Sequence, residues 1–502
     1  MFGGFGGLPK GSKGSEKDKL GVVQGPLVSK GSKGSEKDKL GVIKVPTSLP
    51  QSKPGSTLGN IVPDATVRVK PTVAGPGVGV GKVDFKVEPM VAGRRDLRQD
   101  VNAAKTMLGY GSVYGHWKSR EDFEGAKKEK RVGIRWVGPI FDDSGYGEAC
   151  RNYVAALFRV GFPISSRSVS LGPAVNDSGL PGRVALRTLN IGHSCAINLV
   201  YAPPHFFKDH RDQKAYNIGM FVWEMNGLPG EWVGACNSMN EIWVPCEWNA
   251  KAARDSGVKV PVYVFGHTVA PEEYENVQTL NIPNLDPSWY KFYSIFQWSS
   301  RKNPEGLLRA YLRAFTSKDP VVLILKTYGQ THSTDEEKKV RAEIDAIRKE
   351  VGGSQPRVLL ITKILSRAQI LGLHKLGDCF FLPHRAEGWG LPHFEACMSG
   401  KPVITTNYGG NLEFTKPKHS YLVNYKLAPV SGMDWFKWFT PDMTWAEADS
   451  GALVDALRHV YEYKVEAAEK GLMAKDYVTK NFNWSTIGEA MKRRISEIVK
   501  IL

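Results

Sequence analysis

Residues Cys379–Thr405 read CFFLPHRAEGWGLPHFEACMSGKPVIT and contain the pattern of one strand–loop–helix–strand unit. The apolar run Cys379–Leu382 predicts a buried strand, Leu391–Ser399 predicts a helix, and Pro402–Thr405 predicts a second strand. Apolar strands that alternate with helices are typical of a parallel sheet covered by helices on both faces. This stretch therefore predicts a doubly wound α/β fold.

The same alternation continues on both sides of this stretch, from about residue 131 onward, and is interrupted at Thr268–Ser288, which is rich in Pro and Glu. We therefore predict two Rossmann-like doubly wound domains that face each other across a cleft, over residues 131–285 and 286–480. In such sheets, ligands bind at the carboxyl ends of the strands. The further predicted strands are Val132–Val137, Ala196–Tyr201, Ile218–Trp223, Glu241–Val244, Val260–Phe265, Tyr293–Trp298, Val321–Thr327 and Arg357–Ile361. The further predicted helices are Glu148–Val160, Glu231–Ser238, Trp248–Ser256, Pro304–Thr316, Thr334–Val351 and Arg367–Leu376.

The first 93 residues have a different composition, with 18 Gly and 9 Pro but only three aromatic residues. Such a segment buries too little apolar surface to offset its conformational entropy, so we expect a disordered tail. The sequence KGSKGSEKDKLGV occurs twice in it, at Lys10–Val22 and Lys30–Val42. The mixed charges favour a solvated spacer. The alternative is a basic arm for nucleic acid, anionic lipid or another polyanion, with weak contact to a particle. Aromatic residues return in residues 94–130, which we interpret as a transition segment.

Composition excludes several classes of protein. The chain has 502 residues with a net charge of +16, and its 42% of hydrophobic residues is ordinary for a globular protein. No apolar run approaches the ~18 residues of a membrane-spanning helix, and residues 1–19 do not resemble a secretory signal. The six cysteines are scattered without a C-x-x-C pair, which argues against a zinc finger and a disulfide framework. We expect a cytoplasmic protein, peripheral or particle-associated if the tail binds.

The loop after the strand Cys379–Leu382 carries the strongest sign of a binding site. The two glycines of its EGWGLP segment let backbone amides approach a ligand closely. The proline suits the first turn of a helix, and a helix N-terminus is a natural anion site. Glu387 in the loop and Glu395 about one turn into the helix can accept hydrogen bonds from a sugar and a ribose, while the amides hold phosphate. The donor-binding residues predicted here are Glu387, Gly388, Trp389, Gly390, Leu391 and Glu395.

A second candidate site lies in FQWSSRKNPEGLL, residues 296–308. Arg301 and Lys302 follow a predicted strand, Asn303 is a good N-cap, and proline occupies the first helical position. Two cations beside a helix N-terminus suit a pyrophosphate. The alternative is a plain basic pair on the surface.

The spacing of Glu387 and Glu395, with SGKPVI downstream, closely resembles the E-x7-E signature of the retaining family 4 glycosyltransferases of the GT-B fold. The similarity extends along most of residues 131–500, through SGYGEACRNY, WVPCEWNAKAARDSGV and FQWSSRKNPEGLL. It implies an N-terminal acceptor domain and a C-terminal nucleotide-sugar donor domain. It also implies that residues 481–502, with NWSTIGEAMKRRI, form a helix that crosses back to the first domain.

The resemblance implies roles for these residues. Lys302 matches the family's lysine that neutralises the diphosphate leaving group, Gln297 stands where the family has an arginine, and Arg301 is expected to substitute for that arginine. Glu387 would hold the sugar and Glu395 the ribose, so Glu387 and Lys302 are the predicted catalytic residues. The residues predicted to line the cleft near the acceptor are Gly145, Tyr146, Gly147 and Glu224.

The sequence thus predicts a retaining, hexosyltransferase-type enzyme that uses a nucleoside-diphosphate sugar as co-substrate and needs no other cofactor. The acceptor is a hydroxyl of a glycan, a lipid or a protein. We expect no essential metal, because the chain has no Asp-x-Asp of the kind that holds a metal–nucleotide. Two alternatives stay open: a catalytically inert GT-B module tethered by the tail as a binding or structural protein, and a sugar-nucleotide epimerase or phosphorylase of the same architecture.

Overall fold

The computed structural model describes residues 81–82, 133–142, 144–162, 164–171, 195–440 and 442–502, which all belong to one compact unit. The predicted disordered tail and the transition segment lie outside these residues, except for Gly81 and Lys82. These two residues form a short strand, β1, that pairs in parallel with a strand of the second half of the chain.

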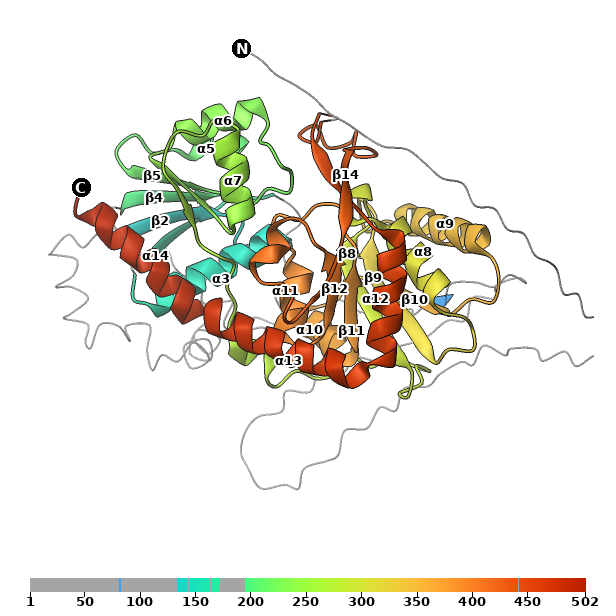
Figure 1. Cartoon of the computed structure of the whole chain (residues 1–502). Helices are drawn as coiled ribbons and strands as arrows, with labels where there is room; N and C mark the ends of the chain where they lie inside the picture. The colour runs from blue at the N-terminus through green and yellow to red at the C-terminus, as the bar shows by residue number, and fades with distance from the viewer. Residues whose placement is uncertain (1–80, 83–132, 143, 163, 172–194, 441) are drawn as a thin grey trace, which may run out of the picture. The chain divides into compact units, whose positions relative to one another are not determined.

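Two parallel sheets form the fold (Figure 1). The N-terminal sheet has the strand order β3-β2-β4-β5-β6-β7 and the C-terminal sheet has the order β1-β10-β9-β8-β11-β12-β13. The strands of the N-terminal sheet are β2 Gly133–Gly138, β3 Ile164–Ser168, β4 Cys195–Tyr201, β5 Tyr216–Met220, β6 Glu241–Val244 and β7 Val262–Val264. Those of the C-terminal sheet are β1 Gly81–Lys82, β8 Tyr290–Gln297, β9 Val321–Tyr328, β10 Arg357–Ile361, β11 Cys379–Leu382, β12 Val403–Thr406 and β13 Tyr421–Val423.

Helices connect the parallel strands, as parallel pairing requires. The predicted helices and strands are confirmed, several of them to the residue. The main differences are that β5 ends before Trp223, that β8 begins at Tyr290 and that α3 begins at Gly145. The α-helices are α3 Gly145–Arg159, α5 Phe207–His210, α6 Gly230–Asn237, α7 Glu247–Asp255, α8 Pro304–Ala314, α9 Thr334–Val351, α10 Arg367–Leu376, α11 Leu391–Met398, α12 Ser450–Glu462, α13 Lys464–Asn481 and α14 Trp484–Val499. The short 3-10 helices are η2 Pro204–Phe206, η3 Pro271–Tyr274, η4 Ser300–Lys302 and η5 Gly410–Glu413.

The C-terminal helix α14 packs against α3 of the first half of the chain (Figure 1). Trp484 donates a hydrogen bond from its indole nitrogen to the side-chain oxygen of Asn152 at 3.0 Å. A Cβ atom on Gly488 would lie 2.6 Å from the carbonyl oxygen of Ala156, so the helices touch at this glycine. The end of the chain therefore returns to the N-terminal sheet, while the boundaries of the two predicted domains stay predictions.

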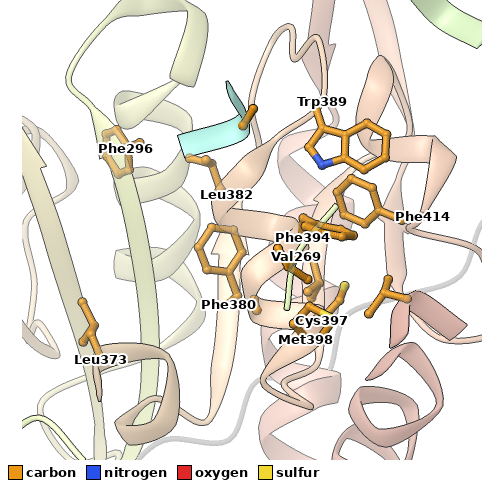
Figure 2. Close-up of a cluster of buried hydrophobic side chains, with 14 of the residues drawn as sticks. Val269, Phe296, Leu373, Phe380, Leu382, Trp389, Phe394, Cys397, Met398 and Phe414 are labelled. Carbon is orange, nitrogen blue, oxygen red and sulfur yellow. The ribbon is translucent and has the colours of Figure 1, made fainter. Parts of the chain in front are cut away.

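A buried apolar cluster includes Trp389, from the loop that carries Glu387, together with Phe394 of α11 and Phe414 (Figure 2). The rings of Trp389 and Phe414 are 5.0 Å apart, and those of Trp389 and Phe394 are 5.4 Å apart. All three side chains are almost fully buried. This cluster fixes the loop and the start of α11 to the C-terminal sheet. All six cysteines are free and buried, as the sequence predicts.

Candidate active site

Four charged side chains from both sheets meet in one place, and we call Glu224, Arg301, Lys302 and Glu387 the donor cluster. One oxygen of Glu387 pairs with the Lys302 ammonium, and the other lies 3.3 Å from the Arg301 guanidinium. Arg301 also lies 3.3 Å from the Glu224 carboxylate, which comes from the segment after β5. The structure therefore brings together four of the residues that the sequence singles out.

The position of these residues follows from the order of the strands. Arg301 and Lys302 form the end of η4 directly after β8, and Glu387 lies in the loop after β11. Because β8 and β11 are parallel neighbours, their carboxyl ends lie at the same edge of the sheet. Asn303 has a left-handed backbone with φ of 54° and caps α8 by accepting a hydrogen bond from the Gly306 amide at 3.0 Å, as predicted.

Two members of the donor cluster are buried, since Lys302 is 8% and Glu387 is 4% exposed, while Arg301 and Glu224 are partly buried. Burial would raise the pKa of the Glu387 carboxyl, but Lys302 and Arg301 outweigh it and hold that pKa well below its usual value. Burial lowers the pKa of Lys302, and the nearby Arg301 adds to this effect. Burial opposes the charge of Arg301 as well, but Glu224 and Glu387 raise its pKa above the ordinary value. Two cations are thus balanced by two carboxylates.

Glu395 belongs to a different network, centred on Arg367, that the sequence does not predict. The Arg367 guanidinium pairs with one oxygen of Glu395 and lies 3.7 Å from Glu148 and 3.9 Å from Glu273. It also donates a hydrogen bond to the Tyr274 hydroxyl at 3.0 Å. The guanidinium of Arg367, which is largely buried, therefore contacts side chains from α3, η3 and α11.

The second oxygen of Glu395 lies 3.3 Å from the ring nitrogen Nε2 of His374. Burial lowers the pKa of His374 and so favours the neutral ring. A carboxylate can only accept, so Nε2 carries the proton, and Nδ1 accepts from the Tyr293 hydroxyl at 2.9 Å. Burial would raise the pKa of Glu395, but Arg367 outweighs it and the pKa falls below the ordinary value. Glu387 and Glu395 thus lie in separate networks, whereas the sequence suggests that both point at one ligand.

The loop between the two carboxylates packs against the N-terminal sheet. A Cβ atom on Gly388 would lie 2.8 Å from the carbonyl oxygen of Trp223, and the Cys246 thiol donates to the Gly388 carbonyl at 3.2 Å. Gly390 caps α11 with φ of +86°, a conformation that favours glycine. The first amides of α11, starting at Leu391, have no partner inside the helix. Any contact of the predicted binding residue Trp389 with a ligand would come from its backbone, since its ring is part of the core.

The predicted acceptor loop lies next to Glu224. The Tyr146 hydroxyl donates to the Val222 carbonyl at 2.8 Å and accepts from the Val222 amide at 3.0 Å. Helix α3 begins at Gly145 because the Ser144 side chain caps it by accepting from the Gly147 amide at 3.1 Å. A side chain on Gly147 would collide with the carbonyl oxygen of Asp142. These residues hold the start of α3 against the segment that carries Glu224.

The sequence contains only weak signals for the Arg367 network. Arg367 is the first residue of a helix that is predicted correctly, and Glu148 lies in the SGYGEACRNY motif. Neither position indicates that the two side chains meet. His267, which follows β7, is structural: it shares a hydrogen bond with the Tyr153 hydroxyl at 2.9 Å, and burial lowers its pKa to about 3.

Taken together, the site offers buried cations, carboxylates and helix amides, which are groups that bind phosphates and hydroxyls. Among the described residues, no three His, Cys, Asp or Glu side chains are grouped so that they could hold a metal ion. Within the same ranges, no helix is both long and apolar enough to cross a membrane.

Comparison with known sequences finds a match in the second half of the chain. Residues 290–426 match the family model described as glycosyl transferases group 1. Glycogen synthase from Mycobacterium tuberculosis is 27% identical over 137 residues, which are 27% of this chain and 28% of the synthase. The chain therefore aligns with little more than a quarter of the length of this relative.

Solved structures resemble a much larger part of the chain. Sucrose-phosphate synthase from Thermosynechococcus elongatus matches with a TM-score of 0.54 and 15% identity, covering 74% of this chain and 100% of that one. HepE from Anabaena, in complex with UDP-glucose, matches with a TM-score of 0.51 and 13% identity, covering 73% and 100%. A glycosyltransferase from Rickettsia africae matches with a TM-score of 0.50 and 13% identity, covering 74% and 99%. The chain therefore has the GT-B fold, and its residues 290–426 match the sequence pattern of the group 1 glycosyl transferases.

Proposed function

We propose that this protein is a retaining, metal-independent glycosyltransferase of family 4 that moves a hexose from a nucleoside-diphosphate sugar to an acceptor hydroxyl. The donor cluster is the observation that carries the proposal. It places a buried lysine, a partly buried arginine and a carboxylate at the carboxyl ends of β8 and β11, where a doubly wound sheet binds its ligand. The proposed place of action is the cytoplasm.

The cations of the donor cluster supply charge stabilisation for the leaving group. In the structure, ion pairs with Glu387 and Glu224 hold the side chains of Arg301 and Lys302 in place, so these side chains are already oriented before the reaction begins. A diphosphate beside them would gain from preorganised electrostatics, which is usually the largest single contribution to catalysis. A phosphate near Lys302 would also favour its charged form against the effect of burial.

In the proposed reaction, the acceptor oxygen bonds to the anomeric carbon on the face from which the diphosphate departs. The bond between that carbon and the diphosphate oxygen breaks, and the acceptor proton goes to a phosphate oxygen of the leaving group. Glu387 would accept hydrogen bonds from hydroxyls of the sugar, and Glu395 from those of the ribose. The two cations would carry the charge that develops on the diphosphate.

A panel of nucleotide sugars, with release of the nucleoside diphosphate as the readout, tests the proposal. We expect Lys302→Ala and Glu395→Gln each to weaken donor binding or turnover at least tenfold, because each removes a charged contact of roughly 1.5–3 kcal/mol. Lys338→Ala is the matched control, since this exposed lysine pairs with Asp335 of its own helix and lies outside the donor cluster. Unchanged donor affinity and turnover in both site variants would refute the assignment of the site.

The same assay separates the alternatives. Donor binding without release of the diphosphate would favour an inert GT-B module. Conversion of the sugar without transfer would favour an epimerase, and release of a sugar phosphate would favour a phosphorylase.

A further inference from the structure

A hairpin of the C-terminal half reaches the N-terminal sheet, and we call its residues 425–440 and 442–448 the strap. It consists of β14 Tyr425–Pro429, β15 Thr444–Ala448 and the segment between them. The two strands pair in antiparallel fashion and extend beyond the strands of the C-terminal sheet (Figure 1). The match to the group 1 glycosyl transferases ends at residue 426, so the strap lies almost entirely outside it.

The connecting segment of the strap packs its aromatic rings on the N-terminal sheet. The ring of Trp438 lies 5.2 Å from that of Trp232 and is stacked on His205 at 5.0 Å. Phe439 lies 5.2 Å from Trp223, the residue directly before Glu224. Trp438 and Phe439 are each 9% exposed and share one apolar cluster with the residues after β5. Burial of two large aromatic side chains makes this a firm attachment.

Hydrogen bonds join the strap to the two segments of the C-terminal half that carry residues of the donor cluster. The Gly432 carbonyl accepts from the Ser300 hydroxyl at 3.1 Å, next to Arg301. The Ala446 amide donates to the Arg385 carbonyl at 2.9 Å, two residues before Glu387. The Arg385 side chain also pairs with Glu447.

A third contact links the strap to the other sheet. The Thr444 amide donates to the side-chain oxygen of Asn226 at 3.2 Å, two residues after Glu224. Each charged segment of the donor cluster is therefore tied to the strap within two residues of its charge. These segments come from different sheets, and the strap contacts all of them.

We propose that the strap is a positioning element of the active site, with Trp438 as the positioning residue that sets Glu224 of the N-terminal sheet against Arg301 of the C-terminal sheet. The inference rests on the proposed function for its catalytic consequence. Trp438 acts on the turn that carries Glu224 indirectly, through Trp232, whose ring lies 4.5 Å from that of Trp223. Loss of Trp438 should therefore affect turnover more than donor binding, because the ion pair between Lys302 and Glu387 joins two segments of the C-terminal half and does not include a residue of the strap.

The strap provides a matched pair of substitutions for the test. Trp438→Ala removes the buried attachment, whereas Trp435→Ala changes the same residue type at a position that is 48% exposed. With UDP-glucose as the probe, we expect Trp438→Ala to lower kcat for diphosphate release at least tenfold with the donor KM within twofold. Amide hydrogen exchange of residues 221–228 should become at least tenfold faster. Trp435→Ala should leave all three quantities within twofold of the wild type.

A milder variant covers the case in which Trp438→Ala does not fold. Asn226→Ala removes one exposed hydrogen-bond acceptor, and we expect it to speed exchange of residues 221–228 at least threefold without lowering the melting temperature by more than about 2 °C. Slow, wild-type-like exchange in the folded variants would overturn the inference, and so would a rise in donor KM that matches the fall in kcat. If no nucleotide sugar is turned over at all, the exchange result still decides whether the strap holds this segment, so the two proposals fail separately.

Discussion

Substitution of Arg367 by methionine tests the network around Glu395. Arg367 pairs with Glu395, which is 3% exposed, and lies within 4 Å of Glu148 and Glu273. Methionine keeps much of the side-chain volume but removes the charge, so it leaves the buried Glu395 carboxylate without its cation. Removing one partner of a buried ion pair typically costs about 3–5 kcal/mol.

The lower end of that range applies here, because His374 still contacts the other oxygen of Glu395. We expect a loss of about 3 kcal/mol, which corresponds to a fall in melting temperature of roughly 6–12 °C for a domain of 150–250 residues. The pKa of Glu395 lies below its ordinary value in the wild type, so this stabilisation is present above about pH 4.5 and is lost as the pH falls through the folded pKa. The difference between variant and wild type should therefore be largest near neutral pH and shrink in acid.

Calorimetric melting from pH 7 down to about pH 2 covers the pH range in which this difference should shrink, and titration with UDP-glucose measures donor affinity. If Glu395 binds the ribose, Arg367→Met should also weaken donor binding at least tenfold. Arg309→Met is the control, since Arg309 pairs with Glu305 and Glu350 on the surface and such pairs contribute little. Equal melting temperatures for Arg367→Met and the wild type at neutral pH would refute the reasoning.

Three further predictions follow from the sequence and the structure. Burial lowers the pKa of His393 from 6.5 to about 4, so the unfolded chain takes up the proton first on acidification. Between pH 7 and pH 4, the free energy of unfolding of the wild type should fall by roughly 3 kcal/mol more than that of His393→Leu, as measured by urea denaturation. The same pH dependence of unfolding in both proteins would contradict this. Sugar transfer should persist in excess chelator, and activity that vanishes there and returns with magnesium or manganese would show that the charge stabilisation is misassigned. Deletion of residues 1–79 should leave the melting temperature unchanged, whereas deletion of residues 1–93 also removes β1 and should lower it slightly; a large drop in the shorter deletion would contradict the spacer interpretation of the tail.

The sequence alone determines most of the elements that build the site. The bounds of α9, β10, α10 and β11 are those predicted, because apolar periodicity and capping residues are local signals. The cap at Asn303 is predicted for the same reason. Local signals also place Arg301, Lys302 and Glu387 at the carboxyl ends of strands, so their meeting could be anticipated from the fold class.

Only the tertiary structure decides which charges pair with which. Arg367 meets Glu148 and Glu395 because α10, α3 and α11 converge, and nothing in the periodicity of any one helix reports the side chains of another. The strap is a similar case: its aromatic residues lie in an irregular segment, and their partners lie on the other sheet. The periodicity of a helix or strand indicates which of its faces is buried. Which side chains that face contacts depends on how distant parts of the chain are placed in the fold. For that reason the sequence identifies the elements and the charged residues of the candidate site, while the network around Arg367 and the position of the strap are properties of the folded chain.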